Sequence, residues 1–443
     1  MNIYINPNLI ISRVNDDYYY VVNPLKENGL RVINKTQFSV LSSIEDSISI
    51  EKLARKTGYC VSELEKMCSI FTKQEIISFS NYFTSVVDTY HIPDFLTFWV
   101  HTSNKCCLRC SYCVIHTLGE NTYMDDEEIK LFCAKIEETV KKNKIHKVNL
   151  RLAGGEPLLC WKLWKDSMHN LKKRLKTLEC QLSVGIITNL VLLSKDNLKW
   201  LIDDEIGIAV SMDGLEQYQD SSRHFPNGKG SYEFVKKNLE ILLNNKMTPS
   251  ILTVVSNNNL DGLVDMTKFM IDLNVHFRYS FVQYDDLDVE KVIVVMKKCF
   301  DIFSDAIEKG YKFSKKFDLC DLKFLHPSIQ TCSNGMTGAA VYVDGDIYFC
   351  QSQFGTTPKI GSIHDSEDLV SIIRKGTYYS EENISDECVM CRYRYICTSG
   401  CPLERVNKKD PHCKAYKELI PIMYKLLAKE RLYTIKQSTL DAV

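Results

Sequence analysis

The sequence predicts an α/β protein: a partial (β/α)6 barrel, preceded by a small winged-helix-like α+β domain and followed by a loop-rich domain. Of its residues, 45% are hydrophobic and 25% are charged, which is the balance of a globular protein. At 443 residues, the chain is too long for one compact domain. Strand-like and helix-like segments alternate through the middle of the chain, as parallel βα units do. The expected domains are residues 1–90, 91–312 and 313–443.

The first domain is predicted from a hairpin followed by three helices. Tyr18–Val22 and Leu30–Ile33 are rich in aromatic and β-branched residues, and turn signals separate them. One helix is expected to begin near Lys35, one to be capped by Ser49, and one to be capped by Ser62. This order of elements is typical of winged-helix folds.

The barrel is predicted from six candidate strands with amphipathic helical patterns between them. The candidate strands are Phe95–His101, Lys147–Leu152, Leu182–Ile187, Gly207–Ser211, Ile251–Val255 and Phe277–Phe281. Repeated βα units require right-handed crossovers and place functional residues at the carboxyl ends of the strands. The last domain is rich in cysteines and loops, and Tyr416–Arg431 is expected to close it as a helix.

Charge and cysteine content restrict the partners and the compartment. The formal net charge is −1, so no basic field recruits nucleic acid. The chain shows neither a secretory signal nor the ~20 apolar residues that span a bilayer, and we expect a cytoplasmic protein with no membrane partner. Disulfides are rare in the cytosol, so the grouping of many of the 18 cysteines indicates metal binding or redox chemistry.

The first cysteine group follows the first barrel strand. Cys106, Cys110 and Cys113 have the spacing C-x3-C-x2-C, and three thiolates can hold three irons of a [4Fe–4S] cube. The open fourth iron can chelate the amino and carboxylate groups of a methionine moiety. Structural zinc normally takes four ligands, and Cys107 is the adjacent candidate for that reading. We expect the Cys107 side chain to point away from its neighbour and set it aside as a ligand.

This spacing, with Leu108 and Tyr112 inside it, resembles the signature of the radical SAM superfamily, whose members usually have Asn where Cys107 stands. Gly154-Gly155-Glu156 ends the second strand, where the family carries its GGE motif; glycines let backbone approach a ligand closely. The resemblance implies a [4Fe–4S] cluster and S-adenosylmethionine (SAM), which is cleaved reductively to a 5′-deoxyadenosyl radical. The implied SAM contacts are Tyr112, Gly154, Gly155, Glu156, Asn189, Ser211 and Arg223.

The roles that the resemblance implies differ among these residues. Glu156 is expected near the methionine ammonium, Ser211 and Arg223 near the SAM carboxylate, and Asn189 near the ribose. The last three have a simpler alternative as ordinary loop residues.

Seven cysteines near the end of the chain resemble the SPASM domain of radical SAM peptide maturases, which holds two further [4Fe–4S] clusters. The resemblance implies an outer cluster on Cys388, Cys391, Cys397 and Cys413, and an inner one on Cys332, Cys350 and Cys401. Cys320 or an open iron completes the inner cluster. Structural zinc is the alternative reading of these cysteines. The expected role is to accept the electron left by substrate oxidation.

The first domain resembles the leader-peptide recognition elements fused to ribosomal-peptide maturases, which bind an extended leader at a sheet edge. The expected edge is Leu30–Asn34, flanked by the third helix. DNA binding is poorly supported, because Ser62–Lys73 carries two lysines against two glutamates.

The leading hypothesis is a radical SAM maturase that crosslinks a ribosomally made precursor peptide through a thioether or a carbon–carbon bond. Its partners are the precursor peptide, with its leader on the first domain, and an electron donor such as flavodoxin or ferredoxin. The alternatives are formylglycine formation, as in anaerobic sulfatase maturases, peptide epimerisation, and a non-catalytic metal-binding scaffold. The sequence does not identify a catalytic base or the modified residue.

Overall fold

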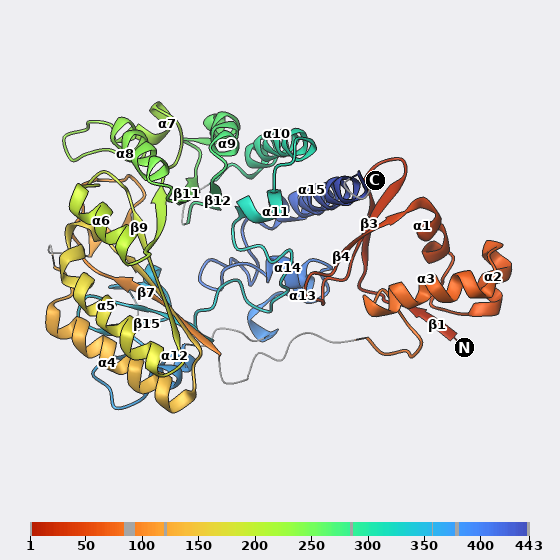
Figure 1. Cartoon of the computed structure of the whole chain (residues 1–443), viewed down its shortest axis with the longest axis horizontal. Helices are drawn as coiled ribbons and strands as arrows, with labels where there is room; N and C mark the ends of the chain where they lie inside the picture. Colours follow the sequence, from red (N-terminus) through yellow and green to blue (C-terminus); the bar gives the residue numbers. More distant parts are fainter. Residues whose placement is uncertain are drawn as a thin grey trace.

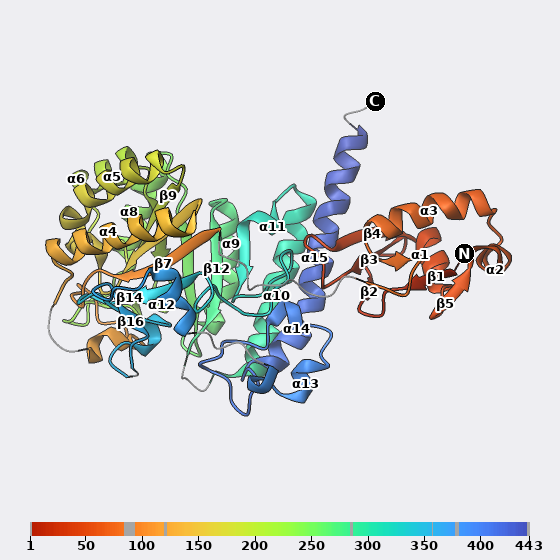
Figure 2. The same ribbon diagram turned by 90° about the horizontal axis from the view of Figure 1, so that it is seen from below.

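The computed structural model describes residues 2–83, 94–118, 122–283, 287–356, 358–376 and 381–440. The molecule is elongated, with the first domain at one end and the large sheet at the other (Figure 1). Helix α15 (Cys413–Leu440) stands between these two parts, and the second view shows it beside β3 and β4 (Figure 2). The fold is mixed α/β, as the sequence predicts.

The first domain contains two small sheets and three helices. Its strands are β1 (Asn2–Ile5), β2 (Ile10–Arg13), β3 (Tyr18–Val22), β4 (Leu30–Asn34), β5 (Ser47–Ser49) and β6 (Ile77–Ser78), and its helices are α1 (Lys35–Ser42), α2 (Ile50–Thr57) and α3 (Val61–Lys73). The sheets have the orders β5-β1-β6 and β2-β3-β4, so the predicted hairpin has a third strand. Ser62 is not the cap of α3. Cys60 is, because the Glu63 carboxylate accepts its backbone N–H at 3.0 Å.

Both faces of β3 are buried. Tyr18, Tyr20 and Val22 belong to or pack against the main core, whereas Tyr19 and Val21 face a smaller core inside the first domain. This alternation follows the two-residue period of a strand. Helix α15 covers the main-core face, where the Tyr20 hydroxyl donates to the Pro421 carbonyl at 3.3 Å. The first domain therefore packs against α15, the last helix of the chain.

Strand β4 is an edge strand of its sheet, as expected for a peptide-binding edge. The helices that pack on it are α1 and α15, whereas α3 packs on α2 and β6. Ile33 of β4 and Leu64, Cys68 and Phe71 of α3 belong to the same small core, so a flanking role of the third helix stays a prediction. The packing of α15, a helix from the far end of the chain, on β4 is indicated by no local sequence pattern.

The large sheet contains all six predicted strands in parallel. They are β7 (Phe95–His101), β8 (Lys147–Ala153), β9 (Gln181–Thr188), β10 (Gly207–Ser211), β11 (Ser250–Val255) and β12 (His276–Phe281), followed by β13 (Phe317–Leu319). The last domain adds β14 (Gly338–Val341) parallel to β7, then antiparallel β15 (Asp346–Tyr348) and β16 (Gly361–Ser362). Different strands form the two edges of the described sheet, so it is an open, partial barrel.

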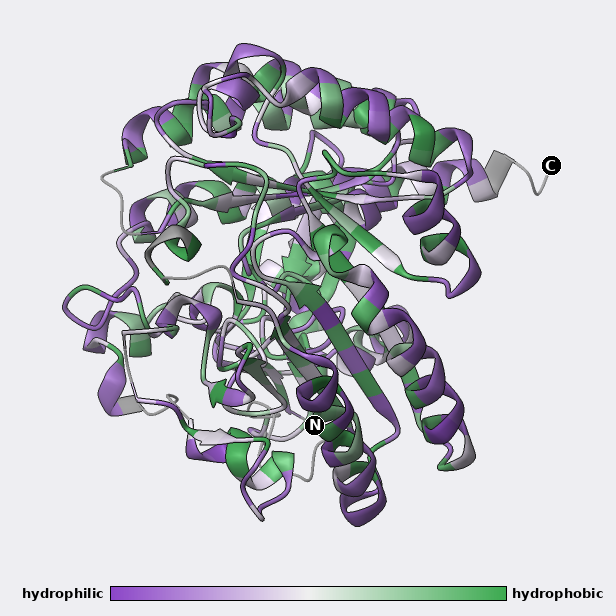
Figure 3. Cartoon of the chain, turned by 90° about the vertical axis from the view of Figure 1, so that its left-hand side faces the viewer, coloured by the Kyte–Doolittle hydropathy of each residue, from purple (hydrophilic) through white to green (hydrophobic). Residues whose placement is uncertain are grey.

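Helices surround the outer side of this sheet (Figure 1). They are α4 (Asp126–Asn143), α5 (Trp161–Thr177), α6 (Lys195–Asp203), α7 (Gln217–Asp220), α8 (Tyr232–Asn244), α9 (Leu263–Asp272), α10 (Val289–Glu308) and α11 (Phe313–Lys316), with 3-10 turns η1 (Val114–Thr117), η2 (Pro157–Leu159) and η3 (Leu260–Gly262). Hydrophilic and hydrophobic stretches alternate along them, as expected for helices with one buried face (Figure 3).

The last domain has short helical turns before its long helix. These are η4 (Gln351–Gln353), α12 (Leu369–Lys375), η5 (Glu381–Asn383), α13 (Asp386–Val389) and α14 (Arg394–Cys397). Helix α15 extends the predicted Tyr416–Arg431 at both ends and packs against α10. In the described part of the chain, no helix combines the length and apolar character needed to cross a bilayer.

Candidate active site

The first three-cysteine group lies on a loop, residues 102–113, that begins where β7 ends; we call it the cysteine loop. Its first half is fixed to the end of β8. Thr102 N–H donates to the Ala153 carbonyl at 2.8 Å, and Gly155 N–H donates to the Ser103 carbonyl at 2.6 Å. The backbone therefore shapes this half of the loop without help from the thiols.

The two glycines of the GGE motif make this contact possible. A Cβ on Gly155 would lie 2.0 Å from the Lys105 carbonyl oxygen, and one on Gly154 would lie 2.7 Å from the Ser103 carbonyl oxygen. Gly154 also has a φ of +121°, which other residues rarely adopt. The sequence predicts close approach to a ligand here, and the structure shows close approach to the cysteine loop itself.

The second half of the loop is tied to the segment after α7. Arg109 N–H donates to the His224 carbonyl at 2.8 Å, and Ser111 N–H donates to the Ser222 carbonyl at 2.9 Å. Between these contacts lies Cys110, whose pKa is raised to about 11 by burial. Cys106 and Cys113 are close enough to contribute to that shift, so the structure brings the three thiols together.

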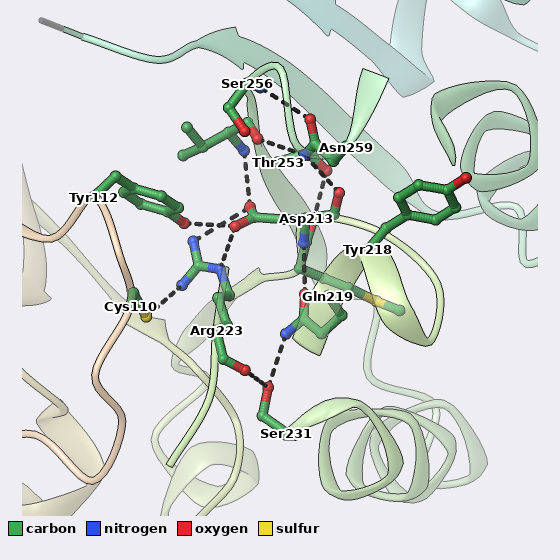
Figure 4. Close-up of polar contacts among 12 residues, drawn as sticks. Cys110, Tyr112, Asp213, Tyr218, Gln219, Arg223, Ser231, Thr253, Ser256 and Asn259 are labelled. Carbon is green, nitrogen blue, oxygen red and sulfur yellow. Dashed lines mark hydrogen bonds and ion pairs between the residues drawn. The ribbon is translucent and has the colours of Figure 1, made fainter. Parts of the chain in front are cut away.

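A buried ion pair lies beside this group. The fully buried carboxylate of Asp213 accepts from Arg223 Nε at 2.8 Å and from the Tyr112 hydroxyl at 2.6 Å (Figure 4). Arg223 Nη1 lies 3.9 Å from Cys110 Sγ, and its guanidinium stands over the Tyr112 ring. Burial lowers the pKa of Arg223, but the neighbouring Asp213, Tyr112 and Cys110 together raise it more, so a permanent positive charge is held against one thiol of the loop.

Two more side chains and one backbone N–H hold Asp213 in place. Gln219 Oε1 accepts from Asp213 N–H at 2.7 Å, Asn259 Nδ2 donates to the Asp213 carbonyl at 2.8 Å, and Val254 N–H donates to the Asp213 carboxylate at 3.0 Å (Figure 4). Asp213 was not among the site residues predicted from the sequence. An acidic residue directly after a buried strand, two positions beyond Ser211, was the available signal.

Asn189 and Cys107 correct an expectation about the loop. Asn189 Nδ2 lies 3.6 Å from Cys106 Sγ and 3.4 Å from Cys107 Sγ, and the two thiols hydrogen-bond to each other. The Cys107 side chain therefore lies beside that of Cys106, and the expectation that it points away is wrong. The loop lacks regular strand geometry at this point, so neighbouring side chains do not alternate. The contact lowers the pKa of Cys106 to about 6 and raises that of Cys107.

Glu156 is completely buried between the second and third strand ends. Its carboxylate accepts from the Thr188 hydroxyl at 2.7 Å, Leu158 N–H at 3.0 Å and Asn189 N–H at 2.8 Å. Burial still raises its pKa to about 7. Ser211 ends β10 and is half-buried. The predicted SAM contacts thus gather at the carboxyl ends of β7 to β10.

The last domain also reaches the cysteine loop. Asn104 Nδ2 donates to the Tyr342 hydroxyl at 2.8 Å, and Asn104 Oδ1 lies 2.7 Å from His101 Nε2. The Phe354 ring packs edge-on against His101 with centroids 5.1 Å apart. Cys350 lies between Tyr342 and Phe354 in the sequence, so it belongs to a segment that packs on the base of the cysteine loop.

Four of the late cysteines line one cavity: Cys388, Cys391, Cys397 and Cys413. Tyr393, Arg394, Tyr416 and Ile420 complete most of its wall. Burial raises the pKa of Cys397 to about 12, and the other three thiols add to that shift. The structure therefore brings together the four residues that the sequence assigns to an outer cluster, around a space between them.

The remaining three, Cys332, Cys350 and Cys401, form another group. Cys332 and Cys350 both act on the Cys401 thiol, whose pKa burial raises to about 12. The Thr331 hydroxyl donates to the Gly400 carbonyl at 3.0 Å and joins the two segments. The groups that act most strongly on the Cys320 thiol are the Phe281 backbone, Arg278, Tyr416 and Asp321, and none of these is a cysteine of this group.

The donor set suits iron–sulfur clusters. Each group consists of thiols, the ligands that hold such clusters, and all 18 cysteines are free of disulfides. Among the residues that the structure describes, no three His, Cys, Asp or Glu side chains converge closely enough to hold a single metal ion. A cube distributes its ligands over separate irons, so its ligands stand further apart than those of one zinc ion.

A three-thiol loop after the first strand of an open parallel barrel, with a glycine-rich turn beside it, defines a radical SAM fold. Residues 100–270 match the model of the Radical SAM superfamily, so this part of the chain is a radical SAM domain. The chain is 26% identical over 332 residues to the cysteine-type anaerobic sulfatase-maturating enzyme of Clostridium novyi (strain NT), covering 69% of this chain and 87% of that protein.

Two solved structures share the fold. The structure described as native anSMEcpe with bound AdoMet has a TM-score of 0.62 at 18% identity, covering 76% of this chain and 99% of its own. Streptococcus suis SuiB bound to precursor peptide SuiA has a TM-score of 0.51 at 16% identity, covering 94% of this chain and 100% of its own. The larger coverage of this chain by SuiB distinguishes the two.

Proposed function

We propose that this enzyme matures a ribosomally made peptide by leader-dependent radical SAM oxidation. The observation that carries the proposal is the combination of a radical SAM domain with a docked N-terminal domain that presents an edge strand. SuiB, which covers 94% of this chain, was solved with a precursor peptide. The cytoplasm, where thiols stay reduced, is the expected compartment.

The cofactor assignment that we propose follows the three thiol groups. Cys106, Cys110 and Cys113 hold the radical SAM cluster, the four cavity-lining cysteines hold an outer cluster, and Cys332, Cys350 and Cys401 belong to an inner one. SAM, when bound to the first cluster, supplies the 5′-deoxyadenosyl radical. Buried Glu156, Asn189 and Arg223 hold charge and hydrogen-bonding groups at the strand ends around it. The last domain is then a SPASM domain.

We propose β4 as the site where the leader adds a strand. Asn23 N–H donates to the Gly29 carbonyl and Lys35 N–H to the Asp17 carbonyl, so the positions of β4 that bond to β3 are the odd ones. Val32 therefore points its backbone N–H and C=O away from the sheet, toward an incoming strand. The Arg431 guanidinium, from α15, donates to the Leu30 carbonyl at the start of this edge.

The proposed product is an intramolecular crosslink, which removes two hydrogen atoms from the peptide. Formylglycine formation is the second candidate, and the sequence similarity to the Clostridium novyi enzyme favours it. The N-terminal domain favours the first, since the anSMEcpe structure covers only 76% of this chain.

The two reactions are separated by product chemistry. The enzyme is incubated anaerobically with SAM, a chemical reductant and either the peptide of a short reading frame adjoining the gene or a sulfatase-derived peptide containing Cys or Ser. Crosslinking is expected to give 5′-deoxyadenosine and a peptide lighter by two hydrogens that does not react with hydrazides. A hydrazide-reactive aldehyde would assign formylglycine formation. An unchanged mass with uptake of solvent deuterium would assign epimerisation.

The edge-strand assignment is tested by Val32→Pro, which removes the outward N–H. We expect loss of fluorescence-anisotropy binding of the precursor peptide, while 5′-deoxyadenosine formation without peptide persists. Arg13→Pro is the matched control, because Arg13 points its N–H away from the sheet on the opposite edge strand, β2. Equal effects of the two substitutions would contradict leader binding at β4.

Metal analysis tests the non-catalytic scaffold. Three cubane clusters predict about twelve irons per chain. Zinc without iron in anaerobically purified protein would favour a structural scaffold instead. A flavodoxin or ferredoxin is the proposed electron donor, and it is tested by replacing the chemical reductant.

A further inference from the structure

One buried carboxylate oxygen in the last domain has no hydrogen-bonding partner. Glu404 Oε1 is inaccessible to solvent and accepts no hydrogen bond. The neighbouring Arg405 does not neutralise it, since its guanidinium donates to the carbonyls of Ser399, Asn383, Thr398 and Gly400. A carboxylate removed from water without a donor is costly, so this position calls for a cation, a metal or a proton.

Glu404 lies against the inner cysteine group. Its N–H donates to the Cys401 carbonyl at 3.1 Å, which closes a turn of four residues. The same turn brings the Leu403 backbone against the Cys401 thiol. Among charged groups, Glu404 raises the pKa of the Cys401 thiol most, ahead of Cys350 and Cys332. Of the two cysteine groups in the last domain, the orphaned carboxylate is therefore next to the one that has three members and not four.

Other candidates for the fourth position fit less well. The Cys320 thiol is surrounded by Phe281, Arg278 and Tyr416. Asp321 acts on Cys332, but its carboxylate is already paired with Arg278 Nη2 at 2.9 Å. Of these three side chains, Glu404 alone combines proximity to Cys401 with an unused buried oxygen.

We propose that the Glu404 carboxylate is the fourth ligand of the cluster on Cys332, Cys350 and Cys401, bound to its iron through oxygen. This inference rests on the proposed function, which assigns a cluster to these cysteines. On binding, the carboxyl group releases its proton to solvent and donates an oxygen lone pair to iron, with no change in oxidation state. The inner cluster is then closed by protein and has no iron free for substrate.

The test compares reconstituted full-length variants by spectroscopy. All carry Cys106→Ala, Cys110→Ala and Cys113→Ala, which removes the signals of the first cluster. In this background, Mössbauer spectra are expected to show one iron with oxygen ligation, and added 13C-cyanide is expected not to bind. Glu404→Ala should open that iron and give 13C hyperfine coupling in the reduced protein. Glu404→Cys should replace the oxygen-ligated component with a thiolate-like one and lower the midpoint potential.

Two variants control for charge and fold. Glu418→Ala removes an exposed glutamate of α15 that pairs with Lys297, and Asp321→Asn removes the other nearby carboxylate. Both are expected to keep the parent spectra. If Glu404→Ala loses the cluster entirely, restoration by Glu404→Cys still identifies the position as a ligand. Cyanide binding to the parent, or identical spectra for every Glu404 variant, would overturn the proposal.

A different measurement tests the assignment of a cluster to these three cysteines, on which the inference rests. Replacing Cys332, Cys350 and Cys401 with alanine should remove about four irons per chain. If these irons remain, the assignment of a cluster to these cysteines is wrong, whatever Glu404 does. If the irons are lost while the Glu404 variants match the parent, only the fourth ligand is wrong.

Discussion

The cysteine loop and the outer cysteine group hold thiols in contrasting ways. The loop lies between strand ends, and backbone hydrogen bonds to Ala153, Ser103, Ser222 and His224 fix it. Three cysteines of the outer group lie on or beside the short helices α13 and α14, which have four residues each, and the fourth, Cys413, begins α15. The four thiols surround a cavity. The protein shapes the first site, whereas we expect the bound cluster to shape the second.

The physical reason is the supply of stabilising contacts. Tyr112 of the loop packs against the main core and donates to the buried Asp213–Arg223 ion pair, and these contacts stabilise the loop before any cofactor binds. The outer group is enclosed by few regular elements, so metal–ligand bonds must supply much of its folding free energy, as in small metal-binding domains. This contrast makes predictions that separate the two regions.

The largest effects are expected from removing one cysteine in each region. Cys110→Ala should abolish 5′-deoxyadenosine formation while the last domain stays resistant to proteolysis. Cys397→Ala should make residues 381–413 sensitive to trypsin, because the outer group loses the ligand that holds it together. All four tryptophans lie between Trp99 and Trp200, so tryptophan fluorescence reports the barrel alone.

The comparison fails if these two variants behave alike. Proteolytic opening of the last domain in Cys110→Ala would mean that the first cluster also stabilises distant structure. A shift of the fluorescence-detected melting temperature in Cys397→Ala, as large as that in Cys110→Ala, would mean that the barrel depends on the outer group.

The next largest effect is expected from Gly155→Ala. The new Cβ would lie 2.0 Å from the Lys105 carbonyl, so the cysteine loop must move. A displacement of the order of an ångström can reduce a rate by about 100-fold, and we expect such a loss in SAM cleavage. Gly207→Ala is the control, since its Cβ would make only ordinary contact, 3.7 Å from the Val184 carbonyl oxygen. Normal cleavage by Gly155→Ala would show that the loop tolerates movement.

A third prediction concerns the ion pair of Asp213 and Arg223. Asp213→Asn leaves a buried guanidinium without its counter-ion, and removing one partner of a buried pair costs about 3–5 kcal/mol. Urea unfolding followed by tryptophan fluorescence should show this loss in the barrel. The double variant Asp213→Leu/Arg223→Met should lose less than Asp213→Asn, since it leaves no unpaired charge. A larger loss in the double variant would contradict that account.

Much of the barrel could be predicted because its strands alternate buried with less buried positions and have clear boundaries. All six were predicted to within two residues. The addition of β14 beside β7 was not, because it pairs segments more than 200 residues apart. Cys107 was misjudged because loop geometry does not follow strand alternation. The roles of Asp213 and Glu404 could not be predicted, because they depend on burial in the folded protein. Asp213 is buried and paired with Arg223, whereas a buried oxygen of Glu404 has no donor.

The smallest predicted effect is the pH dependence of Glu156 in the cofactor-free protein. Burial raises its pKa to about 7, above the ordinary value of 4.5. The native state therefore holds this proton more tightly than the unfolded state. Its contribution to stability is complete below about pH 4.5 and is lost as the pH rises through about 7.

This shift corresponds to about 3.5 kcal/mol at most, at ~1.4 kcal/mol per pKa unit. Glu156→Gln cannot ionise, so the unfolding free energy of the wild type minus that of the variant should fall between pH 5 and 7.5. A difference that is constant with pH would show that Glu156 stays ionised. In that case the three hydrogen bonds to the Glu156 carboxylate would compensate fully for its burial. The protein would then hold a charged group beside the cysteine loop without any cofactor.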